Sequence, residues 1–209
     1  ALPISKEAGG FAEFQKAFPE IVNKHGWAHN GSPGWRSKII YDTNVTQAFN
    51  AGREKQMQAV KHLRPYGLYR HTSIEHPRLA HKAWNGLILP LDDPWWDTHT
   101  PQNGWGCKCG VRQVSKYEYD QLQKNGVPRN VQQLDDSGQP TGHVIRQTVP
   151  VRTEAPQVKR VKWVNKRTGE EEMVPEGIDP GWDYNPGTRR QAELERQLAA
   201  KQSAFDSDN

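Results

Sequence analysis

The sequence predicts an α+β fold. A small mixed domain, with one long helix and short antiparallel strands around a Cys/His loop at residues 76–112, is expected first, followed by an extended arm, a hairpin and a C-terminal helix. Helical spacing of apolar residues from 35 to about 62 indicates the long helix. Short alternating apolar runs between 66 and 114 have the length of strands. Both cysteines of the chain, Cys107 and Cys109, stand in the loop among histidine, glycine and tryptophan residues.

Two helices are expected before the first strand. Residues 10–24 carry phenylalanine, isoleucine and valine at helical spacing, and Pro19 within this run predicts a kink or a break. Residues 30–34 read Asn-Gly-Ser-Pro-Gly, a composition typical of a loop. The long helix follows and ends before Pro65, because the residue that precedes a proline disfavours helical backbone.

Three strands and two further helical segments complete the first domain. The strands are predicted at 66–74, 86–91 and 109–114, and a short helical turn is predicted at 79–84. A helix from 115 to 124 is expected to stop at an Asn-Gly pair. Tryptophan contributes a large buried area, and six of the eight tryptophans fall in the first half of the chain. The compact domain is therefore assigned to residues 1–126.

The second half of the chain is more polar and is divided into two parts. Residues 127–157 are rich in proline, glutamine and glycine and are interpreted as an extended linker or arm. Residues 158–174 predict a hairpin around a Lys-Arg-Thr-Gly turn, and 175–187 is a string of turns. A charged helix with a narrow apolar stripe is expected at 189–205, so residues 158–209 form the C-terminal region.

Composition limits the class of protein. The chain has 209 residues, 34% of them hydrophobic, and its mean hydropathy is −0.93, so part of it is expected to lack a core of its own. No apolar run approaches the roughly 20 residues that span a bilayer, and the N-terminus lacks the layout of a secretory signal, so a soluble protein without a membrane partner is expected. A single Cys-Lys-Cys is not a disulfide framework, which favours a reducing compartment.

The Cys-Lys-Cys motif is interpreted as part of a structural zinc site. In an extended backbone Cys107 and Cys109 project from one face, with Cα atoms roughly 6.6 Å apart, near the upper limit for a disulfide. A bend would bring both thiolates to one ion, and zinc favours a tetrahedron of thiolate and imidazole ligands. His81 and His99 are predicted as the other two ligands, with His76 as a substitute. The competing interpretation is a pair of buried thiols without a metal, beside surface histidines.

An enzyme is the competing functional class, and the chain is predicted not to be one. A zinc-dependent nuclease or deaminase needs an open ligand position and a carboxylate that moves protons. Deaminases place His before Glu and two residues between their cysteines, whereas this chain has Glu75 before His76 and one residue in the Cys pair. Asp92, Asp93 and Asp97 are expected to form turns and helix caps instead of a catalytic pair.

Non-specific contact with DNA is compatible with the charge of the chain. The formal net charge is +4 and the pI is about 9.0, with the cations spread along the chain. Candidate side chains for phosphate contact and base stacking are Arg36, Lys38, Arg70, Lys159, Arg160, Lys162 and Trp163. A solvated positive face is the competing interpretation of the same residues.

A series of motifs occurs in a fixed order between residues 20 and 187. They are Tyr-Asp-Thr-Asn at 41–44, Ala-Gly-Arg at 51–53, Arg-Pro-Tyr at 64–66, the segment 81–86, Asp-Asp-Pro-Trp-Trp at 92–96, Pro-Gln-Asn-Gly-Trp-Gly-Cys-Lys-Cys at 101–109 and the turn-rich segment 174–187. Together they resemble the phage Mu F-like minor head proteins, which are head morphogenesis factors of tailed phages and prophages.

The resemblance implies a structural protein of the virion. A few copies of such proteins associate with the portal vertex inside the capsid, having reached it from the host cytoplasm during assembly, and some relatives enter the host with the DNA. The implied partners are the portal and other capsid or scaffold proteins. The resemblance also supports His81, His99, Cys107 and Cys109 as zinc ligands. The alternative function is a zinc-dependent nuclease or deaminase-like effector delivered with phage DNA.

The chain departs from the family pattern at several points. Asp42 stands where the family usually has a basic residue, and Lys108 replaces the more usual Arg. Longer members carry a helical portal-binding region before the matched part, and this chain starts at or near that part. A fragment of a longer protein, or a shortened copy, is therefore expected.

Overall fold

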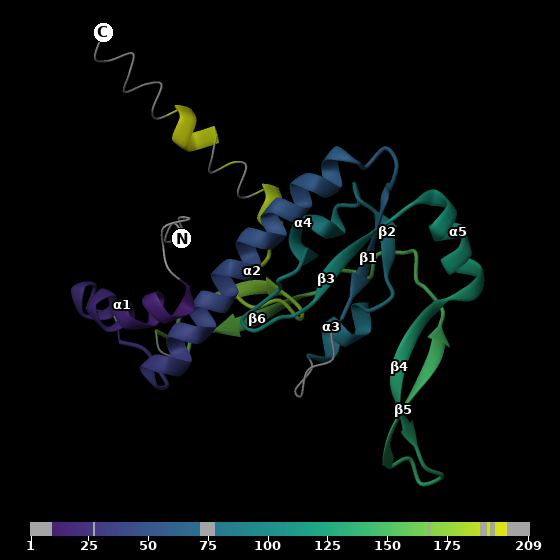
Figure 1. Ribbon diagram of the computed structural model, residues 1–209, viewed down its shortest axis with the longest axis horizontal. Coiled ribbons are helices and arrows are strands. Elements are labelled where there is room, and N and C mark those ends of the chain that lie inside the picture. The colour runs from purple at the N-terminus through teal and green to yellow at the C-terminus, as the bar shows by residue number, and fades with distance from the viewer. Residues whose placement is uncertain are drawn as a thin grey trace.

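Figure 1 shows the computed structural model of the chain, which describes residues 10–26, 28–71, 78–166, 168–188, 192 and 195–199. A long helix, α2 (Pro33–Ala59), runs beside a small antiparallel sheet, and a two-stranded hairpin projects away from both. Helices and small antiparallel sheets are mixed along the chain, so the predicted α+β class with one long helix is confirmed.

The sequence around residue 33 explains where α2 begins. The Ser32 side chain accepts a hydrogen bond from the backbone N–H of Trp35 at 3.3 Å, which satisfies one of the unpaired donors of the first turn. Pro33 occupies the first helical position, where a missing N–H is tolerated. The helix therefore starts inside the segment that was predicted to be a loop.

A shorter helix, α1 (Phe11–Lys24), packs against α2. The rings of Phe11 and Phe14 lie 5.5 and 5.8 Å from the ring of Tyr41 in α2. Pro19 lies inside α1, and the helix continues through it without the break that the sequence allowed.

The central sheet has the strand order β2-β1-β3 and is antiparallel throughout. Its strands are β1 (Tyr66–Arg70), β2 (Ile88–Pro90) and β3 (Gly110–Val114), each within one of the three predicted strands. Leu68 and Tyr69 in β1 are adjacent, so their side chains face opposite sides of the sheet, and each belongs to a different core cluster.

The larger cluster lies on the Tyr69 side. It is covered by two short helices, α3 (Leu79–Trp84) and α4 (Trp95–His99), which bring three buried tryptophans together. On the other side a helix capped by Gly126, α5 (Lys116–Asn125), covers Leu68, Ile88 and Val114. Tyr119 of α5 stacks on Tyr66 at 4.2 Å between ring centroids.

Two hairpins follow the first domain. The residues predicted to form an extended arm are extended, and they pair with each other as β4 (Val127–Leu134) and β5 (Pro140–Val149), which project from the body (Figure 1). The predicted second hairpin is confirmed as β6 (Arg160–Val164) and β7 (Glu171–Pro175). Both hairpins expose most of the side chains that the structure describes in them.

The turn-rich segment after β7 returns to the first domain. Ile178 and Trp182 are buried in the larger core cluster, so the C-terminal region completes the core of the N-terminal one. Of the expected C-terminal helix, the structure describes residues 192 and 195–199, which are helical. None of the described helices is both long enough and apolar enough to cross a membrane.

Candidate metal centre

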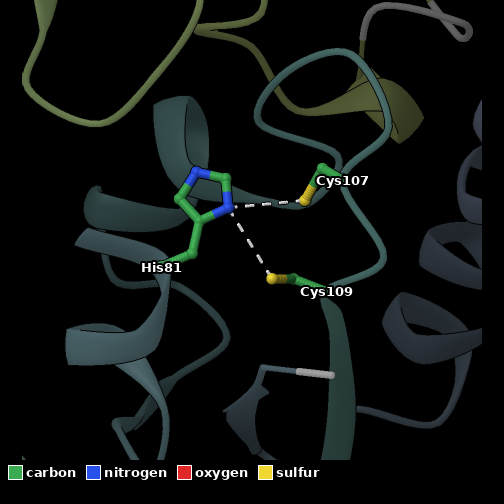
Figure 2. Close-up of side chains that lie close together, drawn as sticks. All are labelled: His81, Cys107 and Cys109. Carbon is green, nitrogen blue, oxygen red and sulfur yellow. Dashed lines mark hydrogen bonds between the residues drawn. The ribbon is translucent and has the colours of Figure 1, made fainter. Parts of the chain in front are cut away.

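Three side chains converge between α3 and β3, as Figure 2 shows. His81 comes from α3, and Cys107 and Cys109 come from the loop that leads into β3. The Nδ1 atom of His81 lies 3.6 Å from Sγ of Cys107 and 3.7 Å from Sγ of Cys109. All three side chains are buried, and their ligand atoms lie within 4.8 Å of one another. This is a compact donor set in the interior of the domain.

A hydrogen bond at the second nitrogen of the His81 ring, Nε2, fixes the orientation of the ring. Nε2 lies 2.8 Å from the carbonyl oxygen of Gly177, and because a carbonyl only accepts, Nε2 carries the hydrogen and donates it. In the neutral ring Nδ1 then has a free lone pair, and it faces the two sulfurs. A backbone carbonyl behind a histidine is a common arrangement around bound metals, since it sets the tautomer and strengthens the ligand.

The surroundings of Cys107 favour its thiolate form. The pKa of Cys107 is lowered to about 4, chiefly by the side-chain hydrogen bond with Cys109 and also by the backbone of Asn103, against the opposing effect of burial. Burial, followed by the charges of both cysteines, raises the pKa of Tyr69, so its hydroxyl stays protonated beside them. Thiolates are the form of cysteine that binds metal ions.

Polar contacts hold the cysteine loop in place. The Gln102 side-chain amide donates to the carbonyl oxygen of Cys107 at 2.9 Å, and Gln102 is itself buried. Arg78 donates to the carbonyl oxygens of Asn103 and Trp105 at 3.3 Å each, and to Asp179 at 2.6 Å. These hydrogen bonds form a clamp that holds the loop in place without a bound metal.

The geometry fits a tetrahedral metal. With sulfur about 2.3 Å and nitrogen about 2.0–2.1 Å from zinc, a nitrogen and a sulfur at neighbouring corners lie about 3.5 Å apart. The two measured distances from His81 Nδ1, 3.6 and 3.7 Å, are close to this value. No disulfide joins Cys107 and Cys109, both of which the structure describes. Two thiolates and an imidazole form a donor set that suits zinc better than hard cations.

His99, the fourth predicted ligand, lies elsewhere in the core. Its ring stacks on Trp95 at 4.3 Å and meets the edge of Trp84 at 5.0 Å. Its Nδ1 lies 2.7 Å from Oγ1 of Thr98, and burial lowers its pKa to about 4. The structure thus brings three of the four predicted ligands together and places His99 among tryptophan rings. The substitute ligand, His76, lies outside the described residues, as does Glu75.

One histidine beside the cluster was not predicted. His71 follows β1, and its Nδ1 lies 3.4 Å from Sγ of Cys109. The pairing of Arg70 with Gly110 places His71 opposite Cys109. The sequence predicted both strands but not their register. The register is the information that would have identified His71.

Two of the aspartates and two of the basic residues named in the sequence analysis form a turn or ion pairs in the structure. Asp93 accepts from the backbone N–H of Trp95 at 2.9 Å, in the turn that precedes α4, and Asp92 pairs with Lys61. Lys38 pairs with Asp42 at 3.0 Å, and Lys162 pairs with Glu171 at 2.6 Å. Two of the six cations proposed for DNA contact are therefore already paired with acidic neighbours.

The fold and the cluster together define a small α+β protein with a buried Cys/His group that could hold a metal ion. Comparison with known proteins gives its family. Residues 12–112 match the family described as Phage Mu protein F like protein. This part of the chain therefore belongs to the phage Mu F-like family, and the resemblance seen in the sequence is confirmed.

Two relatives match beyond this segment. The chain is 31% identical over 163 residues to protein F of Escherichia phage Mu, whose name assigns it to capsid assembly, a match that covers 76% of the chain and 33% of the relative. It is 30% identical over 191 residues to the Mu-like prophage FluMu F protein of Haemophilus influenzae, covering 89% of the chain and 40% of the relative. The chain thus spans between a third and two fifths of the length of these relatives. No solved structure matches it.

Proposed function

We propose that the chain is a structural, non-enzymatic component of head assembly in a Mu-like phage or prophage, with a zinc ion held by His81, Cys107 and Cys109. The observation that carries this proposal is the position of the family match. Residues 12–112 include α1 except its first residue, all of α2, β1 and β2, the first three residues of β3, and all three side chains of the cluster. The part shared with a family that includes a capsid assembly protein is therefore the part that would be organised by the metal.

Burial of the site supports a structural role for the ion. All three side chains are buried, and no carboxylate belongs to the group in the part of the chain that the structure describes. A zinc enzyme needs a ligand position that is open to water and a group that moves protons. For these reasons the nuclease or deaminase alternative is the less supported function.

The exposed hairpins support a role in binding neighbouring subunits. Leu134, Val144 and Ile145 in β4 and β5 are 55%, 66% and 40% exposed, although a two-stranded hairpin in water is marginal without packing. Covering such a hairpin with a partner would stabilise it and bury its apolar side chains. The partners we propose are the portal and other capsid or scaffold proteins, at the portal vertex inside the capsid.

DNA is a weaker candidate partner. The net charge of +4 favours contact with packaged DNA, but Lys38 and Lys162 are already paired with acidic side chains. We therefore expect at most non-specific binding to duplex DNA, with an affinity that falls steeply as salt is raised.

Shortening the β4–β5 hairpin tests the proposed function. In a phage that encodes this chain, residues 129–147 would be replaced by an Asn-Gly turn, which joins the two strands at their base. The purified variant should keep the zinc content and thermal stability of the unchanged protein, because the hairpin lies outside both core clusters apart from Val127. Electron microscopy should find few DNA-filled heads. Normal heads from this variant would contradict the proposal, and restoring the original gene is the control.

A further inference from the structure

We propose that His71 is the fourth ligand of the metal centre and closes its shell with two thiolates and two imidazoles. The inference rests on the metal centre proposed above. It differs from the ligand set expected from the sequence, in which His99 had this place.

The sheet register brings His71 to the site. Arg70 in β1 pairs with Gly110 in β3, so the next residue along β1 stands opposite Cys109. The backbone N–H of His71 donates to the Asn85 side chain at 2.9 Å, which holds this end of the strand. A ligand placed by a sheet and a side-chain hydrogen bond is held on the rigid part of the domain.

Three nitrogen–sulfur distances at the site match the edges of a tetrahedron around zinc. Nδ1 of His71 lies 3.4 Å from Sγ of Cys109, and the other two nitrogen–sulfur distances at the site are 3.6 and 3.7 Å. Neighbouring nitrogen and sulfur corners around zinc lie about 3.5 Å apart. The group whose atoms all lie within 4.8 Å contains His81, Cys107 and Cys109, so His71 must turn toward the other two ligands as the shell closes. Its side chain is only partly buried, so a change of rotamer is sterically easier there than for a fully buried ring.

His99 is poorly suited to the same place. Its ring stacks on Trp95 at 4.3 Å and packs against the edge of Trp84, both of which are buried core residues. Moving the ring to the sulfurs would break these contacts and leave a void among the tryptophans, which destabilises a packed core. The Nδ1 atom of His71, by contrast, already lies 3.4 Å from Sγ of Cys109.

A fourth protein ligand decides the class of the site. Structural zinc sites fill all four corners with side chains, whereas catalytic sites leave one corner for water. With His71 bound, the ion has no open position. The closed shell would then explain why a phage head protein carries a zinc-type donor set without a catalytic carboxylate beside it.

Metal titrations on the full chain test the proposal. Zinc affinity would be measured by competition with a chelator for the unchanged protein and for His71→Ala, His71→Cys, His99→Gln and His143→Ala. His143 lies exposed on β5 and serves as the matched control. Loss of a residue that hydrogen bonds to a metal ligand lowers metal affinity by about 10- to 100-fold. Loss of a ligand itself should therefore lower the affinity by more than about 100-fold.

The expected results separate His71 from the other histidines. His71→Ala should lower zinc affinity by more than about 100-fold, His71→Cys should restore it, and His143→Ala should leave it unchanged. With Co²⁺ as the probe, the visible bands of the tetrahedral ion should shift in His71→Ala, where water can take the fourth corner, and His71→Cys should add sulfur-to-metal absorption. An unchanged affinity and spectrum in His71→Ala, or their loss in His99→Gln, would overturn the assignment of His71 and leave the metal centre standing. An unchanged protein that binds no zinc would overturn both.

Discussion

The Nε2 atom of His81 lies 2.8 Å from the carbonyl oxygen of Gly177, which stands 96 residues later in the chain. A second tie joins Arg78 to Asp179 at 2.6 Å, over 101 residues. Between these two ties Ile178 is buried in the larger core cluster. The turn-rich segment is therefore fastened to the same helix, α3, that supplies the histidine of the candidate metal centre.

Removing the metal should loosen the turn-rich segment. The amides of Ile178, Asp179 and Trp182 are hydrogen bonded, to the carbonyl oxygens of Pro175, Asn103 and Asp179 in that order. Without a metal the His81 ring and the cysteine loop lose their common anchor, so these amides should open more often. Hydrogen exchange with and without a chelator measures this, and we expect faster exchange at all three positions in the chelated protein.

The control for this experiment is the β4–β5 hairpin, none of whose described residues belongs to the His81, Cys107 and Cys109 group or to the larger core cluster. Its amides should exchange at the same rate in both samples. Faster exchange there as well would indicate global unfolding, and protection of the turn-rich segment that does not depend on the metal would refute the coupling.

Arg78 should not tolerate replacement by lysine. Its guanidinium donates to two backbone carbonyl oxygens and to Asp179, and a lysine ammonium lacks the planar fork that reaches all three. Arg78→Lys should lower the free energy of unfolding by about 1 to 2 kcal/mol, measured by urea denaturation. Arg160→Lys, at an exposed arginine with a single backbone acceptor, should change it by less than about 0.5 kcal/mol. Equal effects of the two substitutions would argue against the clamp.

The tryptophans should divide sharply in their contribution to stability. Trp84 is 7% exposed and contacts Tyr69, Trp95, His81 and His99, so Trp84→Ala should cost about 3 to 5 kcal/mol. Trp35 is 55% exposed, and Trp35→Ala should cost less than about 1 kcal/mol. Thermal unfolding of both variants provides the test. A large loss of stability in Trp35→Ala would contradict the exposed position of its ring.

His99 should make the protein sensitive to mild acid. Burial lowers the pKa of His99 from 6.5 to about 4, so between these values the unfolded chain takes up a proton that the folded chain refuses. The stabilising contribution is complete above pH 6.5 and is lost as pH falls toward 4, at most about 3 kcal/mol. His99→Gln should flatten the pH dependence of the unfolding free energy in this window. Parallel profiles for the two proteins would show that His99 is not the titrating group.

Local patterns predicted the elements well, for physical reasons that can be named. The helical spacing before Pro65 indicated α2, and the Asn125-Gly126 stop marked the end of α5, because both signals act within a few residues. The Cys-Lys-Cys spacing likewise identified a shared site for two thiols, since side chains two apart in an extended segment face the same way.

Contacts between distant segments were beyond this reasoning. His71 reaches Cys109 only through the register of β1 and β3, and a shift of one residue would have turned it to the other face. The pairing of β4 with β5 was missed because their polar sequence lacks the alternation of a half-buried strand. The burial of Trp182 depends on a return of the chain to α3 that no local pattern indicates.

Metal content is the most direct test of the account. Elemental analysis of the purified chain should find about one zinc per molecule, and a Cys107→Ser, Cys109→Ser double variant should contain none and unfold at a lower temperature. His143→Ala should keep the full zinc content. A purified chain without zinc that neither takes up added zinc nor gains thermal stability from it would contradict the central claim that a bound ion organises this domain.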